Sequence, residues 1–172
     1  MDDRGVTPVI GVIIMVAVAV ILGAVISGYV FGIGGESQSP APSVVLEHEV
    51  IDNDGDRLVA VTLAAGESVA IDRVYVTGSK DLDVGGGPGS GTAANPDFAS
   101  SAEPLAESSG DNPPQVDIGD TWESGETVYL AVGDNDPEGV TIRVYWTSGG
   151  VEGVNPGTVT GDDTYRIAEF VV

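Results

Sequence analysis

The chain has 172 residues, of which 27 are Asp or Glu and 6 are Lys or Arg, so its formal net charge at pH 7 is −21. A surface this negative repels nucleic acid and anionic lipid headgroups, and neither is expected as a partner. The absence of cysteine excludes disulfide bonds, thiolate metal sites and thiol nucleophiles.

A long apolar run dominates the N-terminal part of the chain. Residues 6–33 carry no charged or amide side chain. A helix of this length would measure about 42 Å, which exceeds the roughly 30 Å hydrocarbon core of a bilayer. Because a single apolar segment can satisfy its backbone in lipid only as a helix, the sequence predicts one membrane-spanning helix over these residues.

The short segment ahead of this run, residues 1–5, reads Met-Asp-Asp-Arg-Gly. A secretory signal peptide has an apolar core of about 7–15 residues and is cleaved after that core, so the run here is about twice too long for one. Asp2 and Asp3 offset Arg4 and the amino terminus, which weakens any inference from flanking charge. The acidic remainder of the chain favours an N-terminus inside the cell and a head outside.

The sequence Asp-Arg-Gly-Val-Thr-Pro-Val-Ile-Gly-Val-Ile at residues 3–13 resembles the start of archaeal type IV prepilins, especially those of halophilic archaea. In that family a prepilin peptidase removes a short charged leader, and the apolar segment is retained. The resemblance implies cleavage between Gly5 and Val6, with Arg4 as the preceding basic residue. Bacterial pilins have a glutamate at the fifth mature position, where this chain has Ile10, so a bacterial-style assembly mechanism is not expected.

Small residues form two rows on the predicted helix. They recur at four-residue spacing, with Ala19, Gly23 and Ser27 in one row and Ala24, Gly28 and Gly32 in the other. Small side chains at this spacing let a second helix approach closely, although glycine and alanine are also common in membrane helices generally. Two adjacent rows favour a packed bundle, and the pilin resemblance implies that such helices bury one another in a filament core.

The rest of the chain predicts a linker at residues 34–42 and one head domain at residues 43–172. The head contains about seven short strand patterns separated by turns rich in Gly, Asn, Asp and Pro, which predicts an all-β antiparallel sandwich or small barrel. The strand patterns cover residues 44–51, 58–63, 69–77, 116–118, 127–132, 140–146 and 165–172. Residues 78–114 are rich in Gly, Ser, Asp and Pro and predict a long, flexible, exposed insertion.

The composition of the head also resembles that of proteins from extreme halophiles. Lys80 is the single lysine, and the apolar residues are mostly small. In molar salt the Debye length falls to about 3 Å, which screens the repulsion among so many carboxylates. We therefore interpret the acidity as an adaptation to the solvent rather than as a binding site.

The sequence offers no evident catalytic, cofactor or metal site. The single histidine, His48, lies on a predicted strand without partners converging on one point, which favours a structural role. The turn at residues 52–56 has carboxylates at alternate positions, as calcium loops do, but Arg57 and Leu63 replace the Gly and Glu that an EF-hand loop requires. We therefore expect a protein that is not an enzyme, with no cofactor and no recognisable metal site, while the sequence leaves open whether the acidic turns bind calcium.

These observations together predict a structural subunit of an archaeal type IV pilus-like surface filament, for which the resemblance suggests a task in adhesion. The implied partners are copies of itself or other pilins, a prepilin peptidase, an assembly ATPase and a membrane platform protein. The subunit would reside in the membrane before assembly and at the cell surface afterwards. Three alternatives stay open: a monomeric membrane-anchored binding module, a secreted hydrolase or binding protein whose N-terminus is discarded, and an archaellin-like motility filament subunit.

Overall fold

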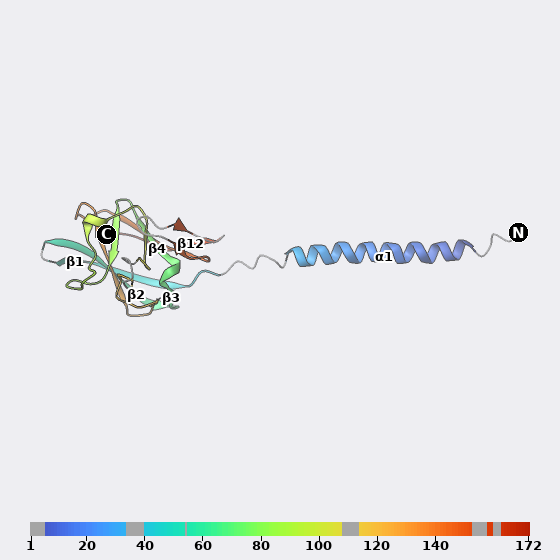
Figure 1. The fold of residues 1–172 in the computed structure, drawn as a ribbon, viewed down its shortest axis with the longest axis horizontal. Coiled ribbons are helices and arrows are strands. Elements are labelled where there is room, and N and C mark those ends of the chain that lie inside the picture. Colours follow the sequence, from blue (N-terminus) through green and yellow to red (C-terminus); the bar gives the residue numbers. More distant parts are fainter. Residues whose placement is uncertain (1–5, 34–39, 54, 108–113, 153–157, 160–162) are drawn as a thin grey trace. The chain divides into compact units, whose positions relative to one another are not determined.

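The structure is a computed structural model of the chain. It describes residues 6–33, 40–53, 55–107, 114–152, 158–159 and 163–172. The chain divides into two compact units, Met1–Gln38 and Ser39–Val172, which we call the helical unit and the head (Figure 1).

The helical unit contains α1 (Val6–Ile33), with the bounds that the sequence predicts. Every side chain from Val9 to Tyr29 is exposed, and this stretch is long and apolar enough to cross a membrane. The helix is apolar on all sides, unlike the helix of a soluble protein, which pairs one apolar face with a polar one. Within the described residues of the helical unit itself, nothing covers this surface.

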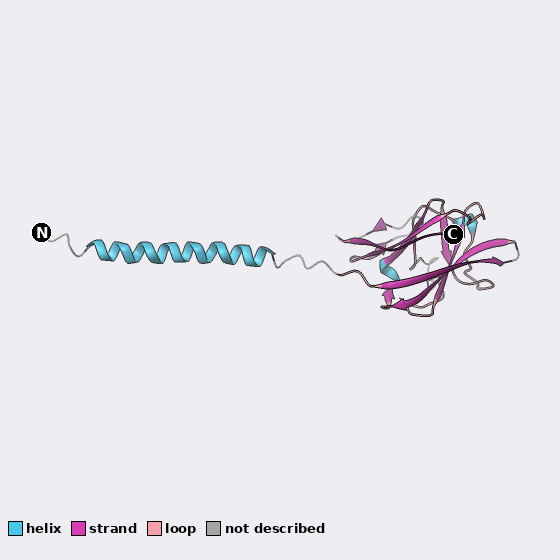
Figure 2. Cartoon of the chain, turned by 180° about the vertical axis from the view of Figure 1, so that it is seen from behind, coloured by secondary structure: helices cyan, strands magenta, loops and turns pink. Residues whose placement is uncertain are grey.

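The described residues of the head form strands and loops, with two short 3-10 turns among them (Figure 2). Two four-stranded sheets make up most of it, and every pairing within them is antiparallel. In spatial order, the first sheet consists of β1 (Val44–Asn53), β2 (Asp56–Gly66), β8 (Thr127–Val132) and β5 (Leu82–Gly85). The second consists of β12 (Thr164–Val171), β9 (Thr141–Thr147), β4 (Val74–Gly78) and β6 (Glu103–Pro104).

The remaining elements are short. Two further antiparallel pairs join β3 (Val69–Ala70) to β7 (Thr121–Trp122) and β10 (Val151–Glu152) to β11 (Thr158–Val159). The two 3-10 turns are η2 (Ile71–Arg73) and η3 (Pro96–Phe98). No α-helix occurs in the described part of the head.

The core lies between the two sheets. Alternate residues of a strand point to one face of its sheet, and those of β2 and β9 are buried in one continuous cluster with Trp122. The members from these strands are Val59, Val61, Leu63, Ile142, Val144 and Trp146. Two antiparallel sheets that share one core form a sandwich, which confirms the predicted fold class and selects the sandwich over the barrel.

The structure differs from the sequence prediction in residues 78–114. Instead of an unstructured insertion, this segment contributes β5 to the edge of the first sheet and β6 to the edge of the second. Leu82, Val84 and Leu105 are fully buried in the core, and the amide of Leu105 donates a hydrogen bond to the carbonyl of Val74 at 3.0 Å. Strands this short carry too little alternation to be recognised in a Gly- and Pro-rich stretch. Residues 108–113 lie outside the described residues.

Two of the strands predicted from sequence also differ from those in the structure. The structure has more strands than the predicted seven because it includes several short pairings. The predicted strand over 69–77 is interrupted by η2, which separates β3 from β4. Residues 116–118 form no strand, because Asp117 has a positive φ of 57° that breaks the extended backbone. Val116 is nevertheless buried in the core, which explains why it is apolar.

Candidate functional site

The small-residue rows predicted for helix packing lie on α1. A methyl group added at Gly23 or Gly28 would meet no atom within 4 Å. Nothing within the described helical unit therefore requires glycine at these two positions. Ala19, Ala24 and Ser27 are likewise exposed on the helix surface. Gly32 belongs to α1, but its surroundings lie outside what the structure describes.

The predicted processing site falls at the beginning of the described chain. Val6 is the first residue of α1, whereas Arg4 and Gly5 lie outside the described residues. The cleavage site therefore stays a prediction. Residues 34–39 of the predicted linker also lie outside the described part of the chain.

The single histidine makes a packing contact. His48 on β1 stacks on Phe170 on β12, with ring centroids 4.3 Å apart and planes 13° apart. The contact joins the edge strands of the two sheets. This placement agrees with the structural role expected for His48.

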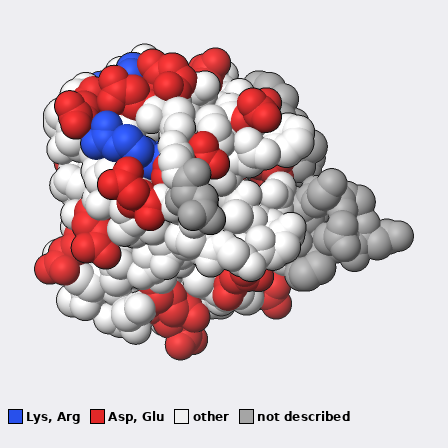
Figure 3. All heavy atoms as spheres, turned by 90° about the vertical axis from the view of Figure 1, so that its left-hand side faces the viewer, with Lys and Arg blue, Asp and Glu red and all other residues white. Residues whose placement is uncertain are grey.

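Exposed carboxylates at one end of the sandwich pair with the few basic side chains. Arg57 forms ion pairs with Asp136 at 3.3 Å and Glu138 at 3.1 Å, and Lys80 pairs with Asp134 at 2.7 Å. The hydrogen bond from the Lys80 ammonium lowers the pKa of the Asp134 carboxyl. Figure 3 shows one face of the molecule, with acidic side chains scattered over it and basic ones among them. These turns thus contain a surface ion-pair network, whose contribution to stability is small in water.

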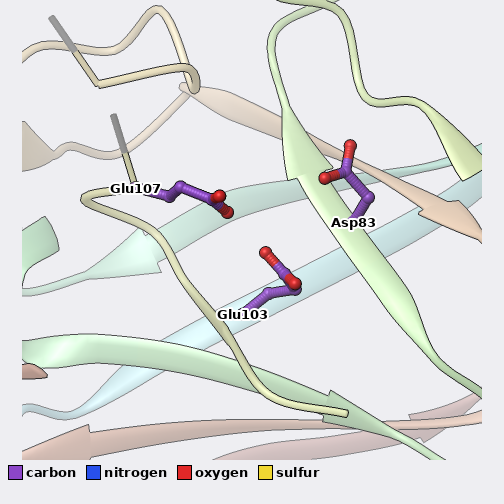
Figure 4. A group of neighbouring side chains, drawn as sticks. All are labelled: Asp83, Glu103 and Glu107. Carbon is purple, nitrogen blue, oxygen red and sulfur yellow. The ribbon is translucent and has the colours of Figure 1, made fainter. Parts of the chain in front are cut away.

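A second group of carboxyls, which the sequence analysis did not identify, lies inside the head. Asp83 on β5, Glu103 on β6 and Glu107 after it are all buried, and one oxygen from each lies within 4.8 Å of the others. Figure 4 shows Glu103 and Glu107 directed into the space that they share with Asp83. We call these three residues the carboxyl cluster.

The hydrogen bonds of the carboxyl cluster leave two of its oxygens unpaired. Oδ2 of Asp83 accepts a hydrogen bond from the amide of Asn95 at 2.6 Å, and Oε1 of Glu103 accepts one from the hydroxyl of Ser100. Oε2 of Glu103 and Oε2 of Glu107 are buried and have no hydrogen-bond partner among the described residues. Such orphaned buried acceptors are uncommon in folded proteins and call for a physical explanation.

The buried setting changes the acidity of the cluster. Burial, reinforced by the neighbouring Glu107, holds the pKa of Glu103 well above its ordinary range. Burial also raises the pKa of Asp83 to about 6, against the lowering effect of the hydrogen bond from Asn95. Both shifts indicate that negative charge in this cluster is poorly compensated by the protein itself.

Sequence reasoning missed the cluster because its members are not grouped in the chain. Asp83 and Glu107 lie 24 residues apart, in the segment predicted to be a flexible insertion. The one available signal was Asp83 itself, a carboxyl between the two apolar residues of a Leu-Asp-Val sequence. An acidic residue there is unusual if the strand is buried on both faces, as β5 is.

A family model matches the N-terminal part of the chain. Residues 4–46 match the family model described as archaeal type IV pilin, N-terminal. Over these residues the chain is similar to the N-terminal segment of archaeal type IV pilins. This match confirms the resemblance drawn from residues 3–13. The pilin-type segment includes Arg4, Gly5, all of α1 and the first residues of β1.

A relative is similar to part of this chain. A protein from Archaeoglobus fulgidus, described as an uncharacterized protein, is 53% identical over 47 residues. The aligned part is 27% of this chain and 33% of that protein, so the similarity spans about a third of the relative's length. The similarity to this relative is therefore confined to a 47-residue part of the chain.

Proposed function

We propose that the chain is the structural subunit of an archaeal type IV pilus-like surface filament, with adhesion as the task of the filament. The observation that carries the proposal is α1, an apolar helix exposed along its described length, inside the segment that matches archaeal type IV pilins. The proposal assigns no enzymatic activity to the chain.

The surface of α1 requires a nonaqueous environment. Each buried apolar side chain is stabilised by about 1.5–3 kcal/mol relative to its exposure in water, and α1 has more than a dozen large apolar side chains exposed. Lipid covers this surface before assembly, and the helices of neighbouring subunits cover it in the filament. The rows at Ala19, Gly23 and Ser27 and at Ala24, Gly28 and Gly32 allow those helices to approach closely.

Processing would precede assembly. A prepilin peptidase cuts between Gly5 and Val6, which removes the charged leader and leaves α1 at the new N-terminus. An assembly ATPase and a membrane platform protein then add the subunit to copies of itself or to other pilins. The N-terminus of the precursor is cytoplasmic, and the acidic head is outside the cell.

The first experiment is to identify the N-terminal residue of the mature protein. Terminal peptides are sequenced by mass spectrometry from the membrane fraction and from material sheared off the cell surface. The expected result is a start at Val6 in both fractions. An intact Met1 confined to membranes would contradict the proposal and favour a monomeric anchored module, and a start near Pro42 would favour a secreted protein whose N-terminus is discarded.

A second experiment tests the helix surface directly. The double variant Gly23→Leu/Gly28→Leu keeps α1 apolar but places bulky side chains in both small-residue rows. It is expected to reach the membrane and be processed, yet to be absent from sheared filaments. The control Ile21→Leu changes the shape of one apolar side chain without changing its volume, and this variant is expected to assemble normally. Normal filaments from the double variant would show that these rows do not pack subunits together.

A further inference from the structure

We propose that Asp83, Glu103 and Glu107 form a binding site for one divalent cation of the calcium class inside the head. The sequence analysis expected no metal site, and the carboxyl cluster became visible only in the fold. The proposal does not rest on the filament function, since it concerns residues of the head outside the pilin-type segment.

The spacing of the carboxyl oxygens suits a single calcium ion. One oxygen from each residue lies within 4.8 Å of the other two. Calcium binds oxygen at about 2.3–2.6 Å, so two oxygens on opposite sides of the ion are about 4.6–5.2 Å apart. One ion placed among the three carboxyls can therefore contact all of them.

The unpaired oxygens supply an independent reason to expect a ligand. Glu103 is 0% exposed and Glu107 is 5% exposed, and Oε2 of each has no hydrogen-bond partner within the described residues. Both side chains are directed into the shared space (Figure 4). Buried carboxylates in proteins are normally paired with a cation or coordinate a metal, because an isolated buried charge is strongly unfavourable.

No basic side chain pairs with the carboxyl cluster among the described residues. There, the ion pairs of Lys and Arg all involve other carboxylates, on β1, on the exposed turns and on β12. The two hydrogen bonds at the cluster come from the neutral donors Asn95 and Ser100. A divalent cation would offset most of the negative charge of three ionised carboxyls.

The ligand set selects the class of metal. All three groups are carboxylates, and hard oxygen ligands favour calcium, magnesium or manganese over zinc or copper. Two carboxyl oxygens already accept hydrogen bonds, so the ion would complete its coordination with water. Calcium tolerates such irregular coordination, whereas magnesium demands near-ideal octahedral geometry at about 2.0–2.1 Å.

A bound ion would join parts of the head that are otherwise held by short strands. Asp83 belongs to the first sheet, Glu103 to the second, and Glu107 to the chain that follows β6. Because β6 has two residues, its hydrogen bonds alone give it little support. The ion would therefore stabilise the attachment of residues 82–107 to the sandwich.

The experiment uses the full chain in detergent, freed of metal with EDTA and then dialysed. Calcium chloride is titrated in by calorimetry in about 1 M NaCl, where the Debye length of about 3 Å weakens binding to surface carboxylates. Wild type is expected to bind one ion per chain in a saturable manner, and calcium is expected to raise its unfolding temperature. Glu103→Gln and Glu107→Gln are each expected to weaken binding by roughly ten-fold or more.

The control variant is Asp97→Asn, which removes one exposed carboxylate from the same segment. It is expected to bind calcium as wild type does. In EDTA, Glu103→Gln is expected to unfold at or above the temperature of wild type, since the amide keeps the shape and, unlike the Glu103 carboxyl, does not have to take up a proton on folding. This result would show that lost calcium binding does not reflect misfolding.

Two results would overturn the proposal. If wild type shows no one-to-one binding, or if Glu103→Gln and Glu107→Gln titrate as wild type does, the cluster holds shared protons instead of a metal. Magnesium chloride, titrated in the same way, is expected to bind more weakly than calcium. Equal or tighter magnesium binding would contradict the assignment to the calcium class.

Discussion

Replacing Leu105 with alanine tests whether residues 78–107 belong to the core. The Leu105 side chain is 0% exposed and is part of the continuous cluster between the sheets. Removing a buried leucine side chain typically costs about 2–5 kcal/mol, because transfer energy is lost and a cavity is left behind. Leu105 directly follows the short strand β6, where the chain can relax in part, so we expect a loss of about 3 kcal/mol.

The expected change is large enough to measure as a shift in unfolding temperature. The head has about 130 residues, and an unfolding entropy of about 2 cal/mol/K per residue gives roughly 0.3 kcal/mol/K for the whole unit. A loss of about 3 kcal/mol therefore lowers the unfolding temperature by about 10 °C. Tryptophan fluorescence of the full chain in detergent reports on the head alone, because Trp122 and Trp146 are the two tryptophans of the sequence.

The matched control is Phe98→Ala in the same segment. Phe98 is 64% exposed, so its truncation is expected to change the unfolding temperature by no more than about 2 °C. If Leu105→Ala behaves like this control, residues 78–107 do not pack into the sandwich. The flexible insertion predicted from sequence would then be the better description.

Two further predictions concern the carboxyl cluster and the β1–β2 pairing. In EDTA, the raised pKa values of Glu103 and Asp83 mean that the folded head holds protons that the unfolded chain releases above about pH 4. These two carboxyls therefore stabilise the folded head fully at low pH, and this stabilisation is lost as pH rises. Between about pH 5 and pH 8, the unfolding temperature is expected to fall less for Glu103→Gln than for wild type. Gly66→Ala is expected to destabilise the head by more than about 1 kcal/mol in denaturant unfolding, because φ at Gly66 is +126° and the added Cβ would lie 2.7 Å from Cα of Val44. Gly91→Ala, with open space around it, serves as its control, and equal midpoints for both variants would contradict this account.

The sequence alone was sufficient to predict those elements whose structure depends on residues that are neighbours in the chain. The bounds of α1 follow from an uninterrupted apolar run, since a lone apolar segment has one way to satisfy its backbone in lipid. The first hairpin, β1 and β2, follows from two strand patterns around a turn rich in Asp, Asn and Gly. The pilin resemblance likewise rests on contiguous residues, and the family match confirms it.

Only the tertiary structure decided how the segments of the head combine. The choice of a sandwich depends on pairings between strands far apart in the chain, such as β2 with β8 and β4 with β9. The short strands β5 and β6 are held by their long neighbours and by buried Leu82 and Leu105, so their own residues carry little strand signal. The carboxyl cluster has the same origin, because Asp83, Glu103 and Glu107 converge only when the edges of both sheets are formed. The local sequence is enough to specify an isolated helix and a hairpin. The burial of three carboxyls in one cluster depends instead on contacts between distant segments, which no short stretch of sequence contains.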